Sequence, residues 1–92
     1  MQVFQEIAKA LNINQERLER DSLKAFLEKE LRNTDAEIYR IAARHGVKSI
    51  LELDGRLTAG EVTEEEIRDD FMELDYLESK KDSILSAIEK IQ

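Results

Sequence analysis

Two long series of apolar residues, spaced by three and four positions, constrain the fold more than any other feature of this sequence. The first series lies within residues 23–45 and the second within residues 67–91. Such spacing places all members of a series on one side of an α-helix, as in helices that pack along their length against another helix. The chain contains no proline that would interrupt either series. The sequence therefore predicts two long helices that form an antiparallel hairpin.

Residues suited to helix termini mark the ends of both long helices. Asn14 is a suitable N-cap, and Gly46 followed by an apolar residue is typical of a Schellman C-terminus. Thr63 and the three glutamates after it form a capping box at the start of the second helix. The helices predicted over 15–45 and 64–91 would be about 46 Å and 42 Å long at 1.5 Å per residue, which suits a hairpin.

Two shorter amphipathic segments complete an all-α prediction. Ser49 opens a capping box, so residues 49–60 are predicted to form a short connecting helix. Residues 1–13 outline a short N-terminal helix that would dock on the hairpin and cover it. We predict one helical domain over 1–92, with a packing and dimer seam formed by Leu27, Leu31, Ile38, Ile41, Ile67, Phe71, Leu74, Ile84 and Ile88.

The apolar faces of the two long helices are wider than a single partner helix would cover. Contiguous exposed apolar area of that kind usually marks an interface. A homodimer that pairs two hairpins into a helical bundle, or a complex with another protein, is therefore expected. The additional apolar residues beside the seams are Phe26, Tyr39, Ala42, Met72, Tyr76 and Leu85.

Lys81 interrupts the second apolar series. A charge in such a seam costs stability unless the side chain reaches solvent or a carboxylate. Lys81 is therefore a candidate for setting the register of an oligomer.

Composition excludes several kinds of functional site. Cysteine is absent and His45 is the only histidine, which excludes disulfides, iron–sulfur clusters, thiolate zinc sites and imidazole-rich metal centres. There is no nucleophile motif and no glycine-rich phosphate loop, and no titratable group has a sequence spacing that pairs it with His45. We predict no enzyme, no metal site and no cofactor, and a structural role for His45 at a helix end. Apolar runs are too short for a membrane span or a signal peptide, so a cytoplasmic protein is predicted.

Charge is unevenly distributed along the chain. The net charge is −7, but residues 1–48 hold nine Lys and Arg against eight Asp and Glu, whereas residues 49–92 hold five against thirteen. An acidic half disfavours nucleic acid as its partner and favours a basic protein surface. The candidate residues for contacting such a partner are Glu65, Asp69, Asp70, Met72, Glu73 and Tyr76.

The N-terminal quarter offers a different function, that of a DNA-binding regulator. Residues 7–24 have the apolar spacing of a helix-turn-helix, and basic residues on its second helix could meet phosphates. Acidic residues are interleaved with them, as on a solvated helix face with internal ion pairs. The basic residues are Arg17, Arg20 and Lys24, and the acidic ones are Glu16, Glu19 and Asp21.

The segment ILELDGRLTAGE, residues 50–61, partly matches a calcium-binding EF-hand loop. Four of its positions agree with such a loop: Asp54, Gly55, Thr58 and Glu61. Its first position is Ile50, where the loop needs a carboxylate. The connecting helix is therefore the preferred interpretation, with a degenerate calcium loop as the alternative.

Several short segments resemble a family of small helical prokaryotic proteins, chiefly archaeal. They are SLKAFLEKELR from Ser22, Ala36-Glu37-Ile38, RHGVKS from Arg44, and the pairs Glu52-Leu53, Gly60-Glu61 and Asp69-Asp70. In that family a long helix stops at a glycine and a valine preceded by tyrosine, where this chain has histidine; a short helix and a second long helix follow. Members are mostly uncharacterised, and some are similar to antitoxins encoded beside small toxin genes. The resemblance implies the same helical fold and no catalytic residue. We therefore predict a protein–protein interaction module, whose most concrete form is an antitoxin that masks a basic toxin surface.

Overall fold

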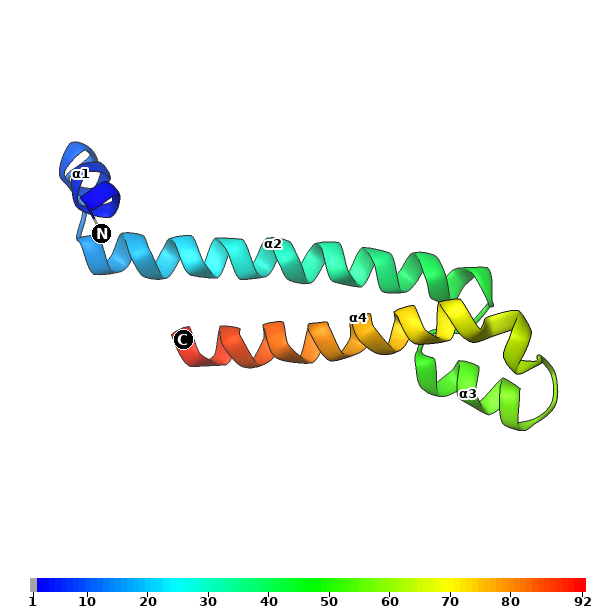
Figure 1. Cartoon of the computed structure of the whole chain (residues 1–92). Helices are drawn as coiled ribbons and strands as arrows, with labels where there is room; N and C mark the ends of the chain where they lie inside the picture. The colour runs from blue at the N-terminus through cyan, green and yellow to red at the C-terminus, as the bar shows by residue number, and fades with distance from the viewer. Residues whose placement is uncertain (1) are drawn as a thin grey trace.

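The computed structural model describes residues 2–92, which form four α-helices and no β-strand (Figure 1). The helices are α1 (Gln2–Leu11), α2 (Gln15–Arg44), α3 (Ile50–Thr58) and α4 (Glu64–Ile91). The long helices α2 and α4 run side by side in opposite directions, and α3 lies at the end of the hairpin where the chain turns back. The predicted all-α fold with two long packed helices is therefore confirmed.

Side-chain caps fix where three of the helices begin. Asn14, Ser49 and Thr63 each precede a helix in extended backbone conformation, and each side-chain oxygen accepts a hydrogen bond from the backbone N–H three residues later. These bonds measure 3.0, 3.2 and 3.3 Å. They satisfy backbone donors that have no partner within the helix, so the capping residues set the starts of α2, α3 and α4.

Left-handed residues end the first three helices. Asn12, Gly46 and Gly60 have φ angles of +56°, +65° and +77°. After α2, the amide of Val47 donates back to the carbonyl of Ala42 at 3.0 Å, the long hydrogen bond of a Schellman motif. The turn folds Val47 onto the hairpin, where only 7% of it is exposed.

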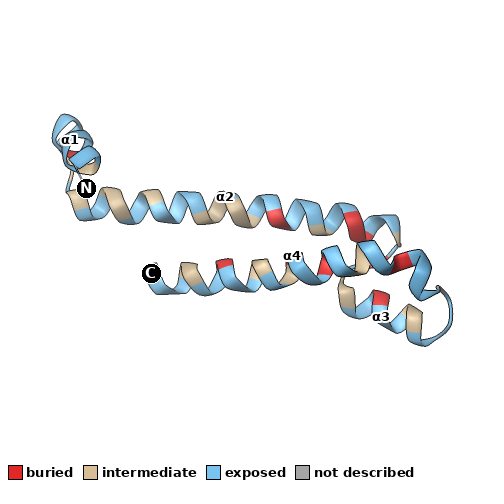
Figure 2. Cartoon of the chain, viewed as in Figure 1, coloured by how far each residue is buried: buried red, intermediate tan, exposed pale blue. Residues whose placement is uncertain are grey.

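The core lies at the α3 end of the hairpin, where three helices meet. Buried residues are concentrated there and become sparse along the two-helix part (Figure 2). Ile41, Leu53 and Leu74 are fully buried. The other buried members of this cluster are Ala42, Val47, Ile67 and Leu77.

The remaining seam residues follow the predicted face with thinner cover. Ile84 is buried farther along α4. The other seam residues are half-buried, because a single neighbouring helix leaves part of each side chain open to solvent. The half-buried seam positions are Leu27, Leu31, Ile38, Phe71 and Ile88.

The molecule is a thin rod. Its principal extents are 61 × 19 × 18 Å, and its radius of gyration is 19.0 Å. A compact domain of this length would have a radius of gyration of about 12 Å. None of the helices in residues 2–92 combines the length and the apolarity needed to cross a membrane.

The prediction that the N-terminal helix covers the hairpin is wrong. α1 packs across the start of α2, where it buries Ala8 but leaves Val3, Ile7 and Leu11 exposed. The reason is that α2 extends beyond the end of α4 (Figure 1), so α1 meets one helix there instead of two. For the same reason Leu23, the first residue of the first apolar series, is 52% exposed.

Polar groups in the seam find partners within the chain. Lys81 Nζ lies 2.8 Å from Asp35 Oδ1, which joins α4 to α2. The Thr34 hydroxyl, on a residue that is 2% exposed, donates to the carbonyl of Glu30 at 2.8 Å. Lys81 therefore contributes to the register of α2 against α4 inside one chain.

Candidate partner-binding surface

The side of α4 opposite the seam is a solvent-exposed mixture of acidic and apolar side chains. Glu65, Asp69, Met72 and Tyr76 recur at steps of four, three and four, so they share one stripe of the helix, and Glu73 lies one turn after Asp69. All five are exposed, and Met72 and Tyr76 are each 64% exposed. We refer to these five residues as the outer face of α4. It contains five of the six residues that the sequence singled out for partner contact.

Asp70, the sixth candidate, belongs to an internal contact instead. Its Oδ1 lies 3.2 Å from Arg44 Nη2, and its Oδ2 lies 2.7 Å from His45 Nε2, close enough for both to donate hydrogen bonds. The Asp70 side chain is only 25% exposed. The carboxylate thus fastens the C-terminal end of α2 to the first turns of α4.

Removing the Asp70 carboxylate should destabilise the hairpin. In Asp70→Ala, the loss of two hydrogen bonds to a charged group at a partly exposed position is expected to lower the free energy of unfolding by about 1 kcal/mol. Asp69→Ala is the matched control, because it removes a neighbouring exposed carboxylate and should change stability by less than about 0.5 kcal/mol. Urea unfolding followed by circular dichroism measures both. Equal effects in the two variants would contradict the contact.

A hollow of about 430 Å³ lies between α3 and α4 beside the outer face. Met72 belongs to both surfaces and joins them. The apolar lining of the hollow is Leu57, Ile67, Phe71 and Met72, and its charged lining is Asp54, Glu64 and Arg68. An apolar hollow with two carboxylates and one guanidinium at its border can take an apolar side chain or the aliphatic stem of a lysine or arginine.

Polar contacts at both ends of α3 hold this hollow in place. Arg56 donates hydrogen bonds to the carbonyls of His45 at 2.5 Å and Gly46 at 3.1 Å, at the C-terminal end of α2. Glu78 on α4 accepts a hydrogen bond from the amide of Ile50 at 2.8 Å. The Arg56 guanidinium thus lies at the negative end of the α2 dipole, and the Glu78 carboxylate lies at the positive end of the α3 dipole. Sequence reasoning identified neither contact, because each joins distant parts of the chain.

The segment compared with a calcium loop is helical. Ile50–Thr58 forms α3, and the Glu52 carboxylate in its first turn accepts a hydrogen bond from the amide of Lys48 at 2.7 Å. Glu61 Oε2 lies 3.8 Å from Arg56 Nε. Within residues 2–92, the structure brings together no group of three or more Asp, Glu or His side chains that could hold a metal ion. The connecting-helix interpretation is the one that the structure shows.

The N-terminal quarter has the connectivity of a helix-turn-helix, with both signs of charge on its second helix. Residues 12–14 join α1 to α2. Arg17 and Asp21 form an exposed ion pair at 3.5 Å. The other basic residues near the start of α2 are Arg20 and Lys24. They line the same hollow as the carboxylates Glu16 and Glu19. This surface therefore lacks the continuous positive charge that usually contacts phosphates.

Comparison with known proteins agrees with the archaeal part of the resemblance seen in the sequence. A relative named uncharacterized protein MJ0235, from Methanocaldococcus jannaschii, is 34% identical over 68 residues, which is 74% of this chain and 82% of the relative. No solved structure matches the chain significantly. The model of the uncharacterized protein MJ0235 family matches residues 1–92. The chain therefore belongs to the uncharacterized protein MJ0235 family.

Proposed function

We propose that this protein is an interaction module that binds a basic protein surface through the outer face of α4 and the adjoining hollow. The observation that carries the proposal is the position of Met72, which joins an acidic, solvent-exposed helix face to an apolar hollow. Interfaces typically combine an apolar anchor with a polar rim, and Tyr and Met are enriched in them. Met72 and Tyr76 would be the anchors, and the surrounding carboxylates would select a positively charged partner.

The charge of the C-terminal half supports this choice of partner. Residues 49–92 hold thirteen acidic against five basic side chains. A surface of that sign attracts a basic partner and disfavours nucleic acid. The most concrete form of this function is an antitoxin that masks a basic surface of a toxin.

The experiment is affinity purification from the native source with the wild-type protein and two variants. The double variant Met72→Ser/Tyr76→Ser removes both anchors of the outer face. Tyr39→Ser is the control, since Tyr39 is 76% exposed on α2 and its loss removes an exposed aromatic side chain elsewhere. We expect a basic protein to be recovered with the wild type and the control and to be lost with the double variant.

Titration calorimetry with that partner gives the quantitative result. The double variant should raise Kd at least about tenfold, which corresponds to about 1.4 kcal/mol. Binding by the wild type should weaken as salt is raised, because charges at the rim of the interface are screened. Recovery of no basic partner, or equal affinity of the double variant and the wild type, would contradict the proposal.

The antitoxin form has a separate test. The product of the reading frame adjacent to the gene should arrest growth when expressed alone, and co-expression of this protein should restore growth. The double variant Met72→Ser/Tyr76→Ser should fail to restore it. An adjacent product that is harmless when expressed alone would exclude this form while leaving the interaction module in place.

A further inference from the structure

Exposed apolar side chains gather at the end of the rod opposite α3. On α1, Val3, Ile7 and Leu11 recur at steps of four and are 57%, 43% and 62% exposed. On the adjoining part of α2, Leu23 and Phe26 are 52% and 58% exposed. Figure 1 shows α1 and the start of α2 at the same end of the molecule. We refer to these five residues as the tip surface.

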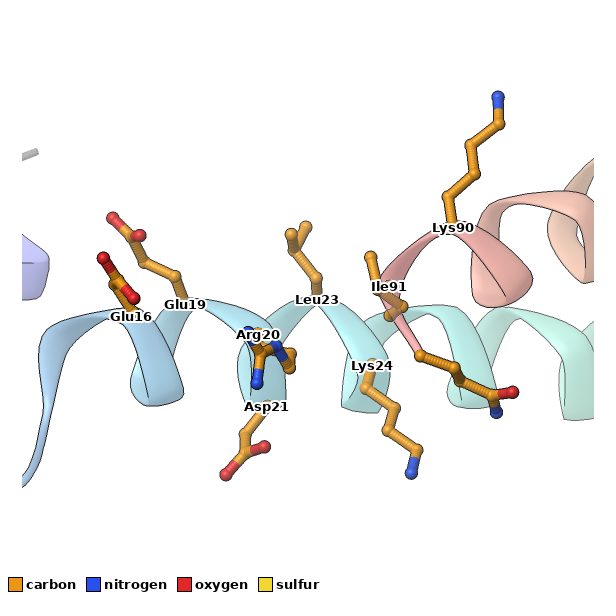
Figure 3. A pocket seen from close by; sticks show the side chains of 9 residues that line it. Glu16, Glu19, Arg20, Asp21, Leu23, Lys24, Lys90 and Ile91 are labelled. Atoms are coloured by element: carbon orange, nitrogen blue, oxygen red, sulfur yellow. The ribbon is translucent and has the colours of Figure 1, made fainter.

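A hollow of about 720 Å³ lies beside the tip surface, where α2 continues past the end of α4 (Figure 3). Leu23 on α2 and Ile91 on α4 are its apolar lining. Its charged lining is ordered along the rod: carboxylates lie toward the start of α2, and amines lie level with the end of α4. The carboxylates are Glu16 and Glu19, the amines are Lys24 and Lys90, and Arg20 and Asp21 lie between them.

The solvent-accessible surface of the chain is larger than that of a compact monomer of the same mass. The chain has 7006 Å² of accessible surface at a mass of 10.7 kDa. A compact monomer of that mass exposes about 5,500 Å², so the excess is about 1,500 Å². A standard protein interface removes about 800 Å² from each partner. The rod therefore has enough uncovered surface for a stable dimer interface in addition to a binding surface on α4.

We propose that a second copy of this chain covers the tip surface and its hollow, with the two α2 helices antiparallel about a two-fold axis. A two-fold interface must be self-complementary. In Figure 3, Glu16, Glu19, Leu23 and Lys90 point to one side of the rod, whereas Lys24 points to the other side. The charges on the first side meet this requirement, because an antiparallel copy sets Glu16 and Glu19 of each chain against Lys90 of the other. Leu23 and the apolar stripe of α1 then pack between the two chains. This dimer uses a surface distinct from the outer face of α4 and leaves that face open to another protein.

Light scattering after size-exclusion chromatography tests the interface directly. The wild type should have twice the chain mass of 10.7 kDa. Leu23→Asp, which introduces a charge on an exposed residue outside the two-helix seam, should have the mass of one chain and keep the helical circular dichroism of the wild type. Leu51→Asp is the control, because Leu51 is 77% exposed at the opposite end of the rod, and this variant should stay dimeric. A wild-type monomer at roughly 100 µM, or a dimeric Leu23→Asp, would overturn the proposal.

Charge reversal tests the pairing of the two chains. The variants Glu16→Lys/Glu19→Lys and Lys90→Glu should each be mainly monomeric, because like charges then face one another across the axis. Their mixture should form a heterodimer, since the reversed charges become complementary. Failure of the mixture to associate would overturn the antiparallel arrangement.

A single cysteine gives a third, covalent measurement. The natural chain has no cysteine, so any disulfide formed by a single-cysteine variant joins two chains. Leu23→Cys should form a disulfide-linked dimer rapidly on mild oxidation, and Leu51→Cys should not. A faster reaction at position 51 than at position 23 would overturn the proposed interface.

Discussion

Replacing Leu74 with alanine is expected to cause one of the largest losses in the free energy of unfolding among single truncations in the α2–α4 seam. Leu74 is fully buried and belongs to the cluster where α2, α3 and α4 meet. Loss of its buried side chain and the cavity left behind should cost about 3 kcal/mol. For a chain of this length, that corresponds to a fall in Tm of roughly 15 °C.

Met72→Ala is the matched control for Leu74→Ala. It removes a side chain of similar size two residues away on the same helix, at a position that is 64% exposed. Its effect should be below about 0.5 kcal/mol. Urea unfolding of both variants must be compared at one protein concentration, because association of two chains would make stability depend on concentration. Equal losses for the two variants would contradict the assignment of the α4 faces.

Leu53→Ala should cause a comparable loss and should also release α3. Leu53 is the fully buried residue of this nine-residue helix. Its truncation should cost about 3 kcal/mol, because a short helix depends on tertiary packing far more than on intrinsic helix propensity. Amide hydrogen exchange should show that residues 50–58 lose protection before α2 and α4 do.

Leu51→Ala provides the comparison within the same helix. Leu51 is 77% exposed, so its truncation should leave both the stability and the amide protection of α3 close to those of the wild type. If Leu51→Ala released α3 and Leu53→Ala did not, the opposite face of α3 would be the packed one.

The candidate surface on α4 was predictable because it depends on local periodicity. Met72 and Tyr76 lie at helical positions opposite Leu74 and Leu77, so a sequence with a clear seam also defines the side that faces away from it. The hollow beside Met72 was not predictable. It exists only because α3 packs against α4, and the contacts that hold α3 join Arg56 to the end of α2 and Glu78 to Ile50.

His45 shows the limit of sequence reasoning about paired groups. Its position at the end of α2 predicts a structural role, and the sequence offers no partner at a helical spacing. Its partner Asp70 lies 25 residues away and is brought within 2.7 Å by the hairpin. The same explanation applies to Lys81, whose sequence position indicates a charge in the seam but leaves its partner on α2, Asp35, unidentified.

The sequence by itself determined the helices, their caps and the face that each long helix buries. These properties depend on residues within a few positions of one another: side chains at Asn14, Ser49 and Thr63 satisfy the nearest backbone donors, and Gly46 and Gly60 tolerate the left-handed conformation that ends a helix.

Only the tertiary structure decided how far each face is covered. The first apolar series begins at Leu23, yet α4 ends level with that residue and α1 packs on α2 alone. Leu23 is therefore exposed although it continues the spacing of the buried seam. Burial depends on which helix reaches a given position along the rod, and that is set by the lengths and register of elements far apart in the chain.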